Sequence, residues 1–212
     1  MNVKLYSYWR SSSSHRVRIA LDFKGIAHEI VPVNLLGGEH ASDAHKSRAP
    51  SGYVPALEID GEVFVESVAI IELLDDLVPE ALLYPQDARD RARVRALVET
   101  VNSGIQPLQN LSVLLRHSND HDARNAWGAH FNARGLEVFE RLMERGPKGK
   151  GKFAYGDVFS AADVFLIPQV FSAKRFGVDV SRFPLISAAI AASHDLPFVK
   201  SAAPEAQVDA PR

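Results

Sequence analysis

The 212-residue chain contains no cysteine at all. This absence excludes a disulfide framework, a cysteine-ligated zinc site and a Cys-x-x-Cys redox centre. It also fits a reducing compartment, so we expect a cytoplasmic protein.

Long apolar runs and an excess of either charge are also absent. No stretch of about 20 apolar residues exists, so we expect no membrane span. Residues 1–6 lack the cationic and apolar regions of a signal peptide. The formal net charge is -2, from 24 Lys and Arg against 26 Asp and Glu, and no basic run is present. These features argue against a nucleic-acid-binding protein.

The first part of the chain alternates short strand and helix patterns. Asp60-Gly61 lies between two β-type runs and predicts a hairpin. Serines precede helical apolar spacing at Ser11–Ser14 and again at Ser67, and Gly25 ends the first helix. We expect strands at 3–8, 29–33, 56–59 and 62–65, and helices from about 14 to 24, at 41–48 and at 67–77. The order β-α-β-α-β-β-α predicts a small α/β module with a mixed sheet.

Strand patterns stop after the segment Pro79–Pro85. Long helices are expected at 88–116 and 122–145, followed by a loop at 146–151, a helix capped by Ser160 with Asp163, and a last helix from Pro184. The tail at 202–212 has little to bury and is expected to be loose. The sequence thus predicts an α/β domain at 1–78, a linker at 79–87 and an all-helical domain at 88–212.

The run Ser11–Ser14 lies where a strand turns into a helix. Free backbone N–H groups and the partial positive charge at a helix N-terminus favour an anion. Hydroxyls beside it can donate to a thiolate and lower its pKa. The alternative is an ordinary capping serine, which is common in polar turns.

Two further pairs suit a peptide with an α-amino-acid head group. Val54-Pro55 precedes a strand; if this proline is cis, the Val54 backbone could pair with an extended peptide. In Glu66-Ser67, the serine and the helix N–H groups suit a carboxylate, and Glu66 suits an ammonium group. A trans proline at a strand start and a simple helix cap are the plainer alternatives.

The order and spacing of these features resemble the glutathione transferases, and within them the zeta class of maleylacetoacetate and maleylpyruvate isomerases. The motif Ser-Ser-Ser-Ser-His-Arg-Val-Arg-Ile-Ala-Leu at 11–21 is similar to the zeta signature. Gly-Ile-Gln-Pro-Leu-Gln-Asn-Leu-Ser-Val-Leu at 104–114 and Ala-Asp-Val-Phe-Leu-Ile-Pro-Gln-Val at 162–170, followed by Arg175-Phe176, resemble two further family blocks. The resemblance extends from Leu5 to about Pro204.

The resemblance implies a thioredoxin-like N-terminal domain, a helical C-terminal domain and a homodimer. It implies that glutathione is the cofactor and that Ser12 contacts its sulfur, assisted by Ser11 and Ser13. Other glutathione contacts are expected at His40, Val54, Pro55, Glu66, Ser67, Gln106 and Asn110. We place Gln106 and Asn110 one helical turn apart on the same face. Arg10 and Arg175 are expected to bind the carboxylates of a small dicarboxylate substrate.

The chain departs from the family pattern at three places. Ser13 replaces the family cysteine, His15 replaces an aromatic residue, and Ala49-Pro50 replaces Asn-Pro. The first change removes a soft nucleophile, so side activities that need an enzyme thiol are in doubt.

The expected activity is glutathione-dependent isomerisation of maleylacetoacetate in the breakdown of tyrosine and phenylalanine. Maleylpyruvate is the alternative substrate, but the family's maleylpyruvate enzymes carry a histidine and arginines in the block containing Gln106. A general conjugating transferase and a non-enzymatic binding module also remain open. His117 and His121 lie four residues apart among aspartates, but we interpret them as a polar turn between helices and expect no metal site.

Overall fold

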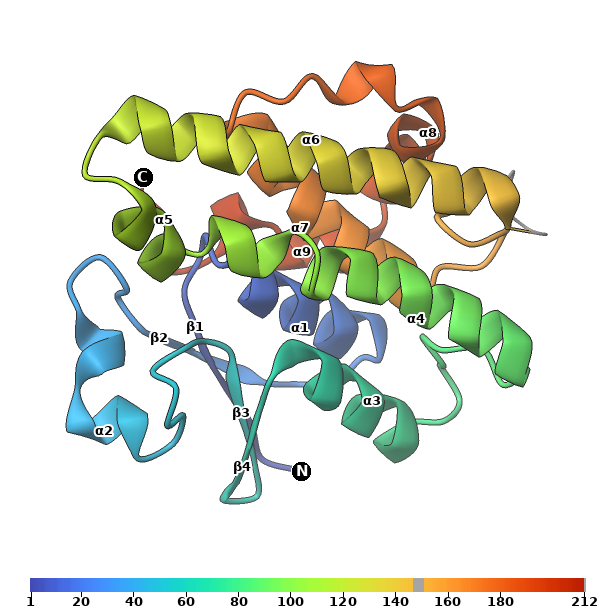
Figure 1. The fold of residues 1–212 in the computed structure, drawn as a ribbon. Helices are drawn as coiled ribbons and strands as arrows, with labels where there is room; N and C mark the ends of the chain where they lie inside the picture. Colours follow the sequence, from blue (N-terminus) through green and yellow to red (C-terminus); the bar gives the residue numbers. More distant parts are fainter. Residues whose placement is uncertain (147–150, 212) are drawn as a thin grey trace. The chain divides into compact units, whose positions relative to one another are not determined.

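The computed structural model describes residues 1–146 and 151–211 (Figure 1). The chain forms two compact units. The first comprises Met1–Leu82 together with Asp195–Arg212, and the second comprises Leu83–His194.

The first unit is built on a four-stranded mixed sheet, as predicted. Its strands are β1 (Val3–Ser7), β2 (Glu29–Pro32), β3 (Ala56–Ile59) and β4 (Glu62–Val65), in the order β2-β1-β3-β4. β1 is parallel to β2 and antiparallel to β3, and β3 pairs with β4 as a hairpin. Asp60 and Gly61 have φ values of 51° and 92°. Positive φ at both central residues is what this tight hairpin turn requires, which confirms the predicted Asp-Gly hairpin.

Within residues 1–82, three α-helices accompany the sheet: α1 (Ser12–Phe23), α2 (Asp43–Lys46) and α3 (Ser67–Leu77), with a 3₁₀ turn, η1 (Glu39–Ala41), before α2. The elements follow the predicted order. α1 packs against α3. Apolar side chains of β1, α1 and α3 are fully buried, among them Leu5, Leu21 and Ile70. Burying them removes apolar surface from water and stabilises the unit.

The second unit is helical. It comprises α4 (Ala88–Asn102), η2 (Gln106–Gln109), α5 (Leu111–His117), α6 (His121–Arg145), α7 (Ala161–Arg175), η3 (Val180–Arg182) and α8 (Pro184–His194). The long α6 packs on α4, α7 and α8 (Figure 1). The core includes the fully buried Phe139 of α6 and Phe165 of α7.

A capping box starts α7, as predicted. The Asp163 carboxylate accepts from the Ser160 N–H at 3.0 Å and from the Ala154 N–H at 2.7 Å. Burial raises the pKa of Asp163 to about 6. Through these two hydrogen bonds, the Asp163 carboxyl joins the loop before α7 to the first turn of that helix.

The single helix predicted over 88–116 is wrong. The structure divides it into α4, η2 and α5. A Cβ atom at Gly104 would lie 2.6 Å from the Thr100 carbonyl oxygen, so the backbone here turns too closely for a side chain. Pro107, which lacks a backbone N–H, then lies within η2. Gln106 and Asn110 therefore do not share one face of an α-helix, contrary to the expectation.

The expected loose tail is also wrong, and the described part of the tail belongs to the first unit. Residues from Pro197 form α9 (Pro197–Ala202), followed by η4 (Pro204–Ala206). α9 packs on α1, and Phe198 contacts Phe23 edge to face at 5.2 Å between ring centroids. Within the tail itself, Ala202 and Pro204 are buried, and the Gln207 side-chain amide donates to the Ser201 and Ala203 carbonyls at 3.0 Å each. The apolar contact of α9 with α1 joins residues from 195 onward to the α/β unit, whereas the sequence assigned them to the helical domain.

Of the loop expected at 146–151, residues 147–150 lie outside the described part of the chain. Within the described residues, no helix combines the length and the apolar character needed to cross a membrane.

Candidate functional site

The serine turn connects β1 to α1. The Ser11 N–H donates to the Tyr8 carbonyl at 2.9 Å, and the Ser11 hydroxyl accepts from the Ser14 N–H at 3.2 Å. Ser11 is thus the N-cap of α1. This is the ordinary capping role that the sequence offered as the alternative to ligand binding. Ser12 and Ser13 are the first two helical residues and are half-buried. In the described part of the chain, neither hydroxyl has a hydrogen-bond partner, so both can bind a ligand at this helix N-terminus.

Arg10 and His15 flank the serines. The Arg10 guanidinium lies over the Trp9 ring, 5.6 Å from its centroid, and is half-buried. His15 is 3% exposed. Burial, with the nearby positive charge of Arg18, lowers the pKa of His15 well below its ordinary value. His15 is therefore a neutral, buried ring, which suits a position where the family often has an aromatic residue.

The Val54-Pro55 peptide bond is cis, one of the two possibilities that the sequence left open. Val54 is buried in a cluster that also contains Tyr8, with Trp9 packed against it. His45 Nε2 lies 2.9 Å from the Tyr53 carbonyl oxygen and holds the loop before Val54. Within the described residues, neither the N–H nor the C=O of Val54 bonds to another group of the chain. Its backbone is thus able to pair with an extended peptide.

Glu66 and Ser67 begin α3. Glu66 is exposed and has a φ of 70°, an uncommon conformation for a residue other than glycine. Ser67 is 3% exposed, and its hydroxyl oxygen accepts from Nη1 of the buried Arg16 at 3.1 Å. Because the Ser67 oxygen accepts from Arg16, its proton remains to donate elsewhere. The guanidinium also adds positive charge near the N-terminus of α3, which favours a carboxylate.

His40 lies in η1 and is half-buried. Among the described residues, its Nδ1 is a buried atom without a hydrogen-bond partner. Gly52 has a φ of 70°, and a Cβ there would lie 3.1 Å from the His40 carbonyl oxygen. The segment containing His40 therefore packs against the chain that leads to Val54.

Contacts within the first unit therefore join the candidate residues. The His40 segment packs against the chain before Val54, and Val54 packs with Tyr8 and Trp9 next to the serine turn. Arg16 of α1 bonds to Ser67.

The helical unit contains the other three predicted residues. Gln106 begins η2, and Asn110 lies between η2 and α5 without a side-chain capping bond; both are half-buried. Arg175 is the exposed last residue of α7.

A buried amide network fixes η2, and sequence reasoning did not find it. Gln109 Oε1 accepts from Asn132 Nδ2 at 2.7 Å and from Gln169 Nε2 at 3.0 Å. Gln169 Nε2 also donates to Asn132 Oδ1 at 2.6 Å, and Asn132 and Gln169 are fully buried. The three amides come from η2, α6 and α7, so no local spacing could have indicated the network. Arg16 beside Ser67 was missed for the same reason, since 51 positions separate them.

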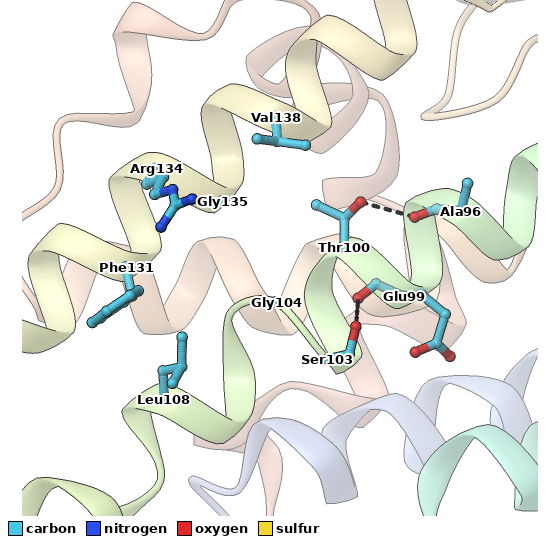
Figure 2. Close-up of a pocket in the computed structure, with 10 residues that line it drawn as sticks. All are labelled: Ala96, Glu99, Thr100, Ser103, Gly104, Leu108, Phe131, Arg134, Gly135 and Val138. Atoms are coloured by element: carbon cyan, nitrogen blue, oxygen red, sulfur yellow. Dashed lines mark hydrogen bonds between the residues drawn. The ribbon is translucent and has the colours of Figure 1, made fainter.

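A pocket of about 490 Å³ lies between α4, η2 and α6 (Figure 2). Its lining consists of Ala96, Glu99, Thr100, Ser103, Gly104, Leu108, Phe131, Arg134, Gly135 and Val138. The hydroxyls of Thr100 and Ser103 donate to carbonyls of their own helix at 2.8 and 2.7 Å. Among the described residues, none of the predicted site residues lines this pocket, and we do not assign the site to it.

Comparison with known proteins decides the family. A model of the glutathione S-transferase N-terminal domain matches residues 5–81. Maleylpyruvate isomerase of Ralstonia sp is 43% identical over 211 residues, covering 98% of this chain and 99% of that protein. Maleylacetoacetate isomerase of Mus musculus is 45% identical over 185 residues, covering 86% of this chain and 83% of that protein. The chain belongs to the glutathione S-transferase family.

Solved structures agree with this assignment and indicate the zeta class. A holo structure of maleyl pyruvate isomerase, described as a bacterial zeta-class glutathione S-transferase, superposes with a TM-score of 0.95 at 42% identity, covering 98% of this chain and 100% of that one. Maleylacetoacetate isomerase from Anaeromyxobacter dehalogenans 2CP-1, with glutathione bound in its active site, gives 0.88 at 43% identity, covering 99% and 98%. The expected glutathione transferase fold, a thioredoxin-like domain with a helical domain, is thus confirmed for this chain.

Proposed function

We propose that this chain is a glutathione-dependent isomerase that converts maleylacetoacetate to fumarylacetoacetate in tyrosine and phenylalanine catabolism. The observation that carries the proposal is the arrangement at the N-termini of α1 and α3. Ser12 has a hydroxyl free to bind, and Ser67 is held by Arg16 with its proton available. These two groups suit the thiolate and the γ-glutamyl carboxylate of one peptide.

The residues of the first unit fit the parts of glutathione. Glu66 and Ser67 suit the ammonium and carboxylate groups of its γ-glutamyl end. The backbone of Val54, preceding the cis Pro55, suits its cysteinyl peptide. We assign His40 to the glycine end. In the helical unit, Gln106 and Asn110 are assigned to further polar contacts.

Glutathione, when bound, supplies a thiolate nucleophile that adds to the cis double bond, permits rotation about it and is then expelled unchanged. The protein must lower the pKa of that thiol so that the sulfur is ionised. Ser12 would donate a hydrogen bond to it, and the N–H groups at the start of α1 would favour its negative charge. Ser11 assists by holding the first turn, and Ser13 offers a second hydroxyl.

The substrate carries two carboxylates, so the site needs cations. Arg10 follows Trp9 directly at the serine turn, and Arg175 ends α7. A guanidinium can bind a carboxylate through two parallel hydrogen bonds. We therefore assign the carboxylates of the substrate to these two arginines.

Maleylpyruvate is the second candidate substrate. It is favoured by the 43% identity to a maleylpyruvate isomerase over nearly the whole of both chains. The two reactions share their chemistry and differ in the length of the acid. General glutathione conjugation is a third possibility and would consume the thiol.

The decisive experiment measures isomerisation of both maleyl substrates with glutathione well below the substrate concentration. Many turnovers per glutathione, with free thiol undiminished at the end, are expected for maleylacetoacetate. A higher kcat/KM for maleylpyruvate would favour the second candidate. Loss of one thiol per product molecule would instead identify a conjugating transferase and contradict the isomerase proposal.

We also propose that the enzyme is a cytoplasmic homodimer. The family resemblance supports this assembly, and a two-fold pair is the commonest closed oligomer. Light scattering at working concentration should give the mass of two chains. A monomeric mass would contradict the assembly without affecting the isomerase proposal.

A further inference from the structure

Residues from the end of the chain hold the segment that precedes the serine turn. The Trp9 N–H donates to Asp209 Oδ2 at 2.9 Å, although 200 positions separate the two residues. The Trp9 carbonyl accepts from Arg18 Nη2 at 3.0 Å. A charged side chain therefore binds each backbone polar group of Trp9, and hydrogen bonds to charged groups are shorter and stronger than neutral ones.

Arg18 joins the same segment to the C-terminal helix. Its Nε donates to the Ala202 carbonyl at 2.9 Å, and its Nη1 donates to the Ser7 hydroxyl at 3.1 Å. Arg18 is 1% exposed, and a buried cation is costly unless it is paired. Burial lowers the pKa of Arg18 to about 10, and the Asp209 carboxylate opposes this shift. Asp209 thus holds the Trp9 peptide and also compensates the charge of Arg18.

This arrangement lies directly before the groups assigned to chemistry. Arg10 follows Trp9, and the Ser11 N–H donates to the Tyr8 carbonyl at 2.9 Å, closing the turn. A displacement of Trp9 would therefore move Arg10 and the first turn of α1, where Ser12 lies. Small displacements of catalytic groups are expensive in rate.

We propose that Asp209 is a positioning residue, which acts through the Trp9 N–H and together with Arg18 to place the serine turn for catalysis. What the turn binds rests on the proposed function, but the positioning role itself does not. The C-terminal segment is therefore part of the supporting structure of the active site.

Three variants test this role. Asp209→Ala removes the acceptor, and Asp209→Asn keeps an acceptor oxygen without the charge. Glu205→Ala is the matched control, because the exposed Glu205 is in the same segment and also acts electrostatically on Arg18. Within the described residues, Glu205 has no side-chain hydrogen bond to Trp9. Thermal unfolding of each variant establishes that it is folded before other measurements are compared.

For Asp209→Ala we expect kcat about tenfold lower and a raised pKa of the bound glutathione thiol, because the turn is displaced. The Kd for glutathione should change less than about twofold, since Val54 and Ser67 remain in place. Asp209→Asn should recover most of the rate, and Glu205→Ala should resemble the parent.

Amide hydrogen exchange separates this proposal from the proposed function, because it requires no substrate. In the parent, the Trp9 N–H should be protected, and Asp209→Ala should remove that protection while Glu205→Ala preserves it. An unprotected Trp9 N–H in the parent would overturn the proposal, even if Asp209→Ala did not fold. Equal losses of rate in Asp209→Ala and Glu205→Ala would also overturn it, because charge alone would then account for the effect.

Discussion

The α/β unit and the helical unit of this protein hold their polar residues differently. In the α/β unit, the candidate site residues lie at chain turns with local signals: a serine run before a helix, a proline before a strand, and a Glu-Ser pair at a helix start. In the helical unit, Gln106 and Asn110 lie where a helix is interrupted, and a network of amides from three elements fixes that interruption. The first kind of arrangement has a local sequence signal, whereas the second depends on which helices pack together.

In the proposed function, most glutathione contacts come from the α/β unit, and Arg175 is the contact that the helical unit makes to the dicarboxylate. The substitution with the largest expected effect tests the assignment of Arg175. Arg175→Ala should lower kcat/KM for the maleyl substrate, because a carboxylate loses its charged partner. The loss of transition-state stabilisation should be about 2–4 kcal/mol. The Kd for glutathione should hardly change. Lys174→Ala is the control, an exposed cation one position earlier. Equal effects on kcat/KM for the maleyl substrate and on the Kd for glutathione would contradict the assignment of Arg175 to the dicarboxylate.

Ser12→Ala tests the α/β side of the comparison. Loss of a hydroxyl hydrogen bond to a charged sulfur should cost about 1.5–3 kcal/mol. That cost should appear as a raised pKa of the bound thiol and a lower kcat, measured by ultraviolet titration and steady-state kinetics. Ser13→Cys restores the family residue and should leave the isomerase rate nearly unchanged. If Ser13→Ala abolishes turnover while Ser12→Ala does not, the assignment is wrong by one position.

Ser67→Ala tests glutathione binding at α3. Calorimetry should show binding weaker by about 1–3 kcal/mol, because the carboxylate loses a donor and Arg16 loses an acceptor. Ser47→Ala is a suitable control, since this exposed hydroxyl donates only to the Ala44 carbonyl in the described part of the chain. Unchanged affinity for glutathione would exclude Ser67 from the site.

Asn132→Ala tests the amide network of the helical unit. Removing this fully buried side chain takes one of two hydrogen-bond partners from Gln109 Oε1 and one of two from Gln169 Nε2, and it leaves a cavity. The free energy of unfolding should fall by about 2 kcal/mol in chemical denaturation. Asn125→Ala, on the same helix but only half-buried, should change it much less. Similar losses would mean that the network adds nothing beyond an ordinary polar contact.

Asp163→Asn tests the pH dependence of the helical unit. Burial raises the pKa of Asp163 to about 6 from an ordinary 3.8. The native state therefore binds this proton more tightly than the unfolded chain, so the carboxyl's contribution to stability falls as the pH rises through this window. From about pH 7.5 down to about pH 5, the parent should gain about 1.4 kcal/mol relative to Asp163→Asn. Parallel stability curves for the two proteins would show that Asp163 does not titrate there.

Much of the α/β unit was predictable because its signals are local. The Asp60-Gly61 hairpin and the capped starts of α1 and α3 depend on backbone preferences of a few consecutive residues. Interruption of the helix after α4 was missed because a helical apolar pattern continues through it. The close approach of Gly104 to the Thr100 carbonyl and the missing N–H of Pro107 accompany the turn of the backbone there.

The sequence by itself determined the order of the elements up to α3, the Asp60-Gly61 turn and the capped helix starts, together with the candidate residues for binding glutathione. These properties depend on neighbouring residues and on side-chain chemistry. Tertiary structure alone decided that Arg16 supports Ser67, that Gln109 joins Asn132 and Gln169, and that Asp209 holds Trp9. Each of these contacts joins residues far apart in the chain. Their formation depends on which apolar surfaces pack together and bring the polar groups within bonding distance, and local sequence patterns do not contain that information.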